Sequence, residues 1–167
     1  MARGSLFVTR GTGGTDDRSD LLGTLAVRFL TDAKEYLQTA RALEHIEDRL
    51  PTGPCYFLLC HAIELVLKSF LATRGATEEQ LTKRLGHKLL KAYKRAQTRG
   101  LSPSDPRIPE IIEWMHPFHE DMVFRYRQTG SKRLPAFGEL LDAVATLIGD
   151  VEPVVRDHFR SVNRLRP

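Results

Sequence analysis

The chain has 167 residues, and its 25 Lys or Arg against 21 Asp or Glu give a net charge of +4. A chain of this length can bury a substantial core in one domain, so folding requires neither disulfides nor a structural metal. No signal-peptide pattern is found, and charged residues interrupt the longest apolar stretch, so we expect a soluble, cytoplasmic protein without a membrane span.

The beginning of the chain is expected to be a flexible arm over residues 1–19. Its RGTGGT segment contains no lysine of a phosphate-binding loop, which argues against a nucleotide cradle. A first helix is predicted from about Asp20 to Asp48, because apolar residues recur there at steps of three and four. The next helix follows after a short break, which predicts that the two helices are antiparallel neighbours. Residues 20–167 are expected to form one helical domain.

The stretch Cys55–Gly75 is predicted to be the central helix, because its apolar run is too continuous for a surface helix. His61, Glu64 and Lys68 fall within an arc of about 60° on the helical wheel, at about 100° per residue. An unpaired buried polar group costs several kcal/mol, so this stripe must meet partners on a neighbouring element. The two cysteines, both on this helix, would point in different directions, which indicates reduced thiols.

Three further helices are predicted after a short helix or turn at residues 76–86. The first covers about His87–Arg99, and the second starts near Pro109 with a kink at Pro117. The last occupies about Gly138–Arg164. The fold class is therefore predicted to be all-α, an antiparallel up-and-down helical bundle of four to five main helices.

Three short motifs carry a family resemblance. They are His61-Ala62-Ile63-Glu64-Leu65 with Lys68, Gly86-His87 with Leu89, and the pair Arg125-Tyr126 before the final helix. Over roughly residues 22–160 the chain resembles the HEPN superfamily. The resemblance implies a small helical bundle that commonly dimerises and often works beside a nucleotidyltransferase-type partner in toxin-antitoxin or phage-defence systems. In the catalytic branch it implies RNA cleavage without metal.

The chain departs from that family at the ribonuclease motif, Arg-x(4–6)-His near the start of a late helix. The nearest arrangement is Arg41 with His45, which is one residue too short and lies on the first predicted helix. The chain therefore resembles a divergent member, and whether it is an enzyme stays open.

Four residues are candidates for catalysis: His61, Glu64, Lys68 and His87. Glu64 precedes Lys68 by four residues, the favourable order for an ion pair on a helix, and His61 lies one turn earlier on the same face. A histidine can transfer protons near neutral pH, and an adjacent carboxylate would set its tautomer. The alternative is structural, in which these groups satisfy one another and a neighbouring helix or a twin subunit.

Positive charge is concentrated between Leu81 and Gly100, where no Asp or Glu occurs. Such a run can bind the phosphates of a nucleic-acid backbone, because each contact releases counterions. The alternative is an ordinary solvated face. The candidate nucleic-acid-binding residues are Arg84, Lys88, Lys91, Arg95, Arg125 and Arg127.

The fourth predicted helix contains ExxHxxHE, formed by Glu113, His116, His119 and Glu120. Di-iron bundles use Glu-x-x-His from two helices, and a second copy is absent here. No metal or cofactor is therefore predicted, and a metal-dependent bundle enzyme centred on Glu113 and His116 is kept as an alternative.

These observations favour a HEPN-like module that binds RNA, a nucleotide or a protein partner in a toxin-antitoxin or phage-defence setting. A homodimer is expected, with RNA and a nucleotidyltransferase-type protein as candidate partners. The first alternative is a divergent metal-independent ribonuclease that uses His61 or His87 with a nearby arginine.

Overall fold

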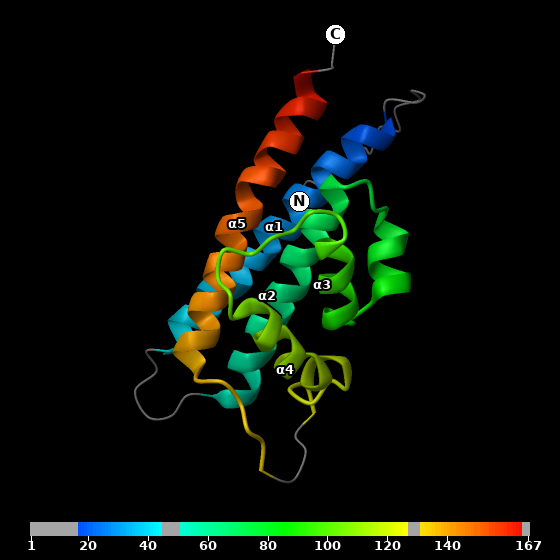
Figure 1. The fold of residues 1–167 in the computed structure, drawn as a ribbon. Coiled ribbons are helices and arrows are strands. Elements are labelled where there is room, and N and C mark those ends of the chain that lie inside the picture. The colour runs from blue at the N-terminus through cyan, green and yellow to red at the C-terminus, as the bar shows by residue number, and fades with distance from the viewer. Residues whose placement is uncertain (1–16, 45–50, 127–130, 165–167) are drawn as a thin grey trace, which may run out of the picture.

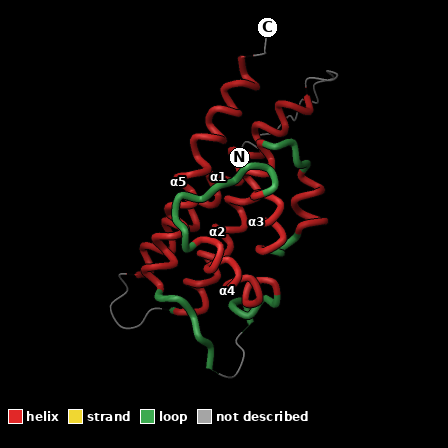
Figure 2. The backbone as a smooth tube through the Cα atoms, viewed as in Figure 1, coloured by secondary structure: helices red, strands yellow, loops and turns green. Residues whose placement is uncertain are grey.

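The structure is a computed structural model that describes residues 17–44, 51–126 and 131–164, and within these ranges it is helical with no strand (Figures 1 and 2). The elements are α1 (Asp17–Glu44), α2 (Thr52–Thr73), the π-helical turn η1 (Gln80–Leu85), α3 (Leu89–Gln97), α4 (Ile108–Glu120) and α5 (Phe137–Arg164). The predicted all-α helical bundle is confirmed.

Helix α2 lies at the centre of the bundle and contacts each of the other four α-helices. The long helices α1 and α5 run beside it, and α3 and α4 cover another side (Figure 1). α1 runs antiparallel to both α2 and α5, as the colour gradient shows. The two long helices and the two short ones therefore surround α2 and bury most of its surface.

The burial of α2 follows from its composition, because it is apolar on nearly all sides. By length and hydropathy α2 could cross a membrane, but 83% of the relevant window is buried inside the bundle. That burial is typical of the core helix of a soluble protein. Both thiols, Cys55 and Cys60, are buried and free, and burial raises the pKa of each.

Several element boundaries differ from the predicted ones. α1 begins at Asp17, three residues before the predicted start, so residues 17–19 of the predicted arm are helical. Residues 1–16 of that arm and the predicted helix end at Asp48 lie outside the described residues. The predicted helix from His87 begins only at Leu89, because Gly86 has φ 56° and Lys88 is not helical. Arg84 therefore lies on η1, and the proposed basic stripe does not run continuously through it.

Helix α4 ends at Glu120 and does not continue toward Tyr126. Met122 adopts φ 54°, the left-handed conformation that commonly closes a helix. The Val123 amide then donates to the Phe118 carbonyl at 2.9 Å. This ending leaves the last turn of α4 facing α2. The irregular segment 131–136 is held by Trp114, whose Nε1 donates to the Arg133 carbonyl at 3.1 Å.

Replacing Gly86 with Ala is expected to destabilise the protein by about 1–3 kcal/mol, because φ 56° with ψ −130° is strained for any residue with a Cβ. Gly149→Ala is the matched control. Gly149 is helical and a Cβ there meets nothing within 4 Å, so this change should stabilise by about 0.4–1 kcal/mol. Urea unfolding of both variants measures the two effects, and equal effects of the same sign would contradict the prediction.

Candidate functional site

The candidate site is centred on Glu64, which lies on the side of α2 that faces α3 and α4 and is 2% exposed. One carboxylate oxygen, Oε1, accepts a hydrogen bond from Lys68 Nζ at 2.5 Å. The other, Oε2, lies 2.6 Å from His119 Nε2 and 2.9 Å from His87 Nδ1. The four-residue spacing on α2 places Lys68 beside Glu64, whereas the histidines arrive from α4 and from the link before α3.

His61 completes this group, which we call the Glu64 cluster: His61, Glu64, Lys68, His87 and His119. The Nδ1 atom of His61 is 3.7 Å from Glu64 Oε2, which is beyond hydrogen-bond distance. That nitrogen is buried and has no hydrogen-bond partner.

Aromatic neighbours hold the His61 ring in place. Phe57 stacks on it with ring centroids 5.7 Å apart, and Tyr36 of α1 meets its edge at 4.7 Å. Packing against these two rings therefore orients the His61 ring.

The cluster keeps Glu64 ionised. Burial by itself would raise the pKa of Glu64, but the hydrogen bond from His119 and the charge and hydrogen bond of Lys68 outweigh burial. The pKa of Glu64 therefore lies well below its ordinary value. A permanent negative charge in the interior attracts cations and orients the imidazoles around it.

The cluster is open to solvent on one side. The His87 side chain is 41% exposed and that of His61 is 18% exposed, whereas His119 is 3% exposed. Near this rim, the Arg125 guanidinium lies 5.1 Å from the centroid of the Phe57 ring that stacks on His61. A small ligand could thus reach the histidines without unfolding the bundle.

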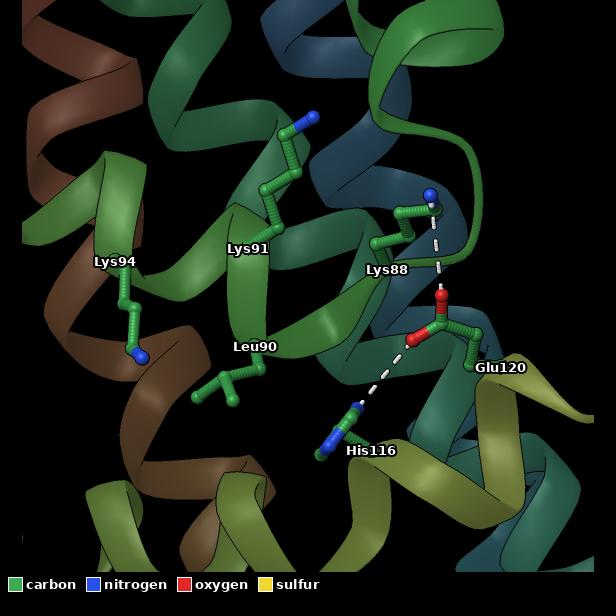
Figure 3. Close-up of a pocket in the computed structure, with 6 residues that line it drawn as sticks. All are labelled: Lys88, Leu90, Lys91, Lys94, His116 and Glu120. Atoms are coloured by element: carbon green, nitrogen blue, oxygen red, sulfur yellow. Dashed lines mark ion pairs between the residues drawn. The ribbon is translucent and has the colours of Figure 1, made fainter.

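A basic groove lies between α3 and α4, with a volume of about 300 Å³ (Figure 3). We use the term basic groove for the site lined by Lys88, Leu90, Lys91, Lys94, His116 and Glu120. The single carboxylate in it, Glu120, lies 4.0 Å from Lys88 Nζ and 3.5 Å from His116 Nδ1. Lys91 and Lys94 make no ion pair with this carboxylate, so the groove carries excess positive charge.

The basic groove adjoins the Glu64 cluster at two places along the chain. His87 belongs to the cluster, and the next residue, Lys88, lines the groove. In α4, His119 belongs to the cluster and the next residue, Glu120, lines the groove. A phosphate-bearing ligand in the groove would therefore lie close to the half-exposed His87.

The structure brings the four candidate catalytic residues together. His61, Glu64, Lys68 and His87 all belong to the Glu64 cluster, although their catalytic role stays a prediction. His119 was predicted only as part of the ExxHxxHE motif and not as a member of this cluster, because its contact with Glu64 depends on the packing of α4 against α2. His119 is the buried histidine of that motif.

The metal alternative centred on Glu113 and His116 has no support in this geometry. Glu113 is exposed, and His116 faces Glu120 in the basic groove. Within the described residues, the three side chains that could share an ion are His61, Glu64 and His119, with ligand atoms all within 4.8 Å of one another. The candidate ligands therefore come from α2 and α4 together.

The candidate nucleic-acid-binding residues do not all lie at one place in the structure. Lys88 and Lys91 line the basic groove, and Lys94, which was not proposed, lines it with them. Arg95, half-buried on α3, does not line the groove. Lys91 and Lys94 of α3 follow Lys88, the residue just before the helix, at steps of three residues, and all three line the groove.

The remaining candidates lie elsewhere. Arg84 is exposed on η1, and Arg125 is exposed beside Phe57. Arg127 lies outside the described residues. Basic side chains thus occur both at the groove and beside Phe57, which stacks on His61 of the Glu64 cluster.

Fold and site together define an all-α bundle whose central helix carries a buried carboxylate surrounded by histidines, next to a basic groove. Comparisons of the chain with protein-family models, with curated proteins and with solved structures find no match.

Proposed function

We propose that this protein is a cytoplasmic, HEPN-like RNA-binding module whose basic groove contacts backbone phosphates. The observation that carries the proposal is the set of three lysines, Lys88 just before α3 with Lys91 and Lys94 on it, in a groove of about 300 Å³ with only one carboxylate. Lysine contacts to phosphate release condensed counterions, which favours a polyanion over a single small anion. The toxin-antitoxin or phage-defence setting, the homodimer and the nucleotidyltransferase-type partner rest on the family resemblance alone.

The surroundings of the groove support RNA as the polyanion. Single-stranded RNA is bound through basic tracks combined with rings or guanidinium planes on which bases stack. Arg125, exposed over Phe57, offers such a plane beyond the Glu64 cluster. His87 of the Glu64 cluster directly precedes the groove residue Lys88, so a strand in the groove would pass near this imidazole.

The proposal is tested by anisotropy of a labelled single-stranded RNA, titrated with protein at several salt concentrations in EDTA. Wild type is expected to bind at low salt. The logarithm of its association constant should fall linearly with the logarithm of the salt concentration. Lys88→Gln/Lys91→Gln/Lys94→Gln should reduce the salt slope by about 2, since each phosphate contact to a single strand contributes about 0.7. Its affinity at low salt should fall roughly tenfold or more.

The matched control is Arg156→Gln/Arg160→Gln/Arg164→Gln, which removes the same charge from exposed positions on α5. This variant should bind nearly as wild type. Absence of RNA binding at low salt, or equal weakening by the two triple variants, would refute the groove as the binding site. RNA cleavage in EDTA that is lost in His87→Ala would instead support the divergent metal-independent ribonuclease.

A further inference from the structure

We infer that His61, Glu64 and His119 form a binding site for a divalent transition-metal ion, with Zn²⁺ as the reference ion. The inference goes beyond the proposed RNA binding and does not depend on it. Neutral imidazoles with one carboxylate are a ligand set that Zn²⁺ and related first-row ions accept. The candidate ligand atoms are His61 Nδ1, Glu64 Oε2 and His119 Nε2.

The ligand spacing fits an ion. With metal–ligand bonds of about 2.0–2.1 Å in tetrahedral geometry, ligand atoms stand about 3.3 Å apart. The distances from Glu64 Oε2 are 2.6 Å to His119 Nε2 and 3.7 Å to His61 Nδ1, one on either side of that value. All three ligand atoms lie within 4.8 Å of one another, so adjustments of the side chains would bring them to the tetrahedral spacing.

The unpartnered nitrogen of His61 is the second observation that points to a ligand. Its Nδ1 atom is buried without a hydrogen-bond partner, and a buried polar atom left in this state costs free energy. The stacking on Phe57 and the edge contact with Tyr36 hold this nitrogen toward Glu64. A bound cation would satisfy the atom that the protein itself leaves unpaired.

The surrounding residues supply what a metal site requires beyond its first ligands. Lys68 binds Oε1 at 2.5 Å, which fixes the carboxylate and leaves Oε2 directed at the histidines. His87 Nδ1, at 2.9 Å from Oε2, stands on the exposed side, where a fourth ligand would bind. The fourth position would be filled either by His87, which would close the site, or by a solvent molecule that His87 contacts, which is the open arrangement of reactive metal sites.

The test uses the full chain without an affinity tag, stripped with EDTA and then desalted. Zn²⁺ is titrated by calorimetry, and Co²⁺ is titrated by its visible absorption, which reports coordination directly. Wild type is expected to bind one ion per chain. His61→Phe preserves a ring between Phe57 and Tyr36 and removes the nitrogen, so it should fold normally and bind roughly 100-fold more weakly or worse.

Two further variants make the result decisive. His119→Gln removes the second imidazole and should weaken binding to a similar degree, whereas His158→Gln, on α5 and outside the ligand group, should bind the ion as wild type does. Lack of stoichiometric binding to wild type, or unchanged binding to His61→Phe, would overturn the site. Because the RNA titrations are performed in EDTA, failure of the metal site and failure of the groove are separate results.

Discussion

Replacing Glu64 with Ala is expected to lower the free energy of unfolding by about 3–5 kcal/mol, because the Lys68 ammonium is left buried without its counter-charge. The same change removes the acceptor of His119 and His87. For a domain of this size the loss corresponds to a decrease of roughly 6–20 °C in Tm. Thermal and urea unfolding in EDTA measure it without any contribution from bound metal.

The control for this prediction is the double variant Glu64→Leu/Lys68→Met. Replacing a whole buried ion pair by apolar groups is often close to neutral, so the double variant should be more stable than Glu64→Ala. Equal stability of wild type and Glu64→Ala would show that Lys68 reaches water and that the cluster is not buried in solution.

The Glu64 carboxylate is expected to make the stability of the protein depend on pH. Its pKa is lowered in the fold from an ordinary value of 4.5, because the hydrogen bonds and the charge of Lys68 outweigh burial. A lowered carboxyl pKa contributes stability that is fully present above the ordinary value and is lost as the pH falls toward the folded value. The stability difference between wild type and Glu64→Ala should therefore shrink below about pH 4.5, as urea unfolding at a series of pH values would show.

Phe70→Ala is expected to destabilise the protein by about 3–5 kcal/mol, because this ring is 1% exposed at the centre of the bundle. Its removal leaves a cavity in the core and deletes the contact in which the Arg74 guanidinium lies 5.0 Å from the ring centroid. Urea unfolding monitored by circular dichroism measures the loss.

Phe159→Ala makes the identical chemical change at a site that is 41% exposed on α5. Surface substitutions of this kind usually alter stability by less than about 0.5 kcal/mol. The partial burial of the ring near Gly23 would increase the cost of its removal. A cost at Phe159 equal to that at Phe70 would contradict the placement of α2 as the central helix.

The helices were predictable because local patterns specify them. The apolar run that begins near Cys55 predicted a buried central helix, and α2 is that helix. Boundaries were less predictable, since single backbone conformations set them. Gly86 stops the chain from entering α3 until Leu89, and Met122 ends α4, although neither effect follows from hydrophobic period.

The site was predictable only where its members share one helix. His61, Glu64 and Lys68 were placed on one face by their spacing along α2, and the contacts of Glu64 with both neighbours agree with it. His119 was not assigned to the cluster and Lys94 was not proposed for the groove, because their positions depend on how α3 and α4 pack against α2.

The sequence by itself determined the helical class, the central position of α2 and the alignment of its three polar residues, because helical period and apolar run length act within about twenty residues. The tertiary structure decided which partners meet Glu64. His119 is 55 positions away from it and His87 is 23 positions away, and only the packing of α4 and the link before α3 against α2 brings both imidazoles to one carboxylate oxygen. Contacts at such separations depend on the docking of whole elements, which no local pattern encodes.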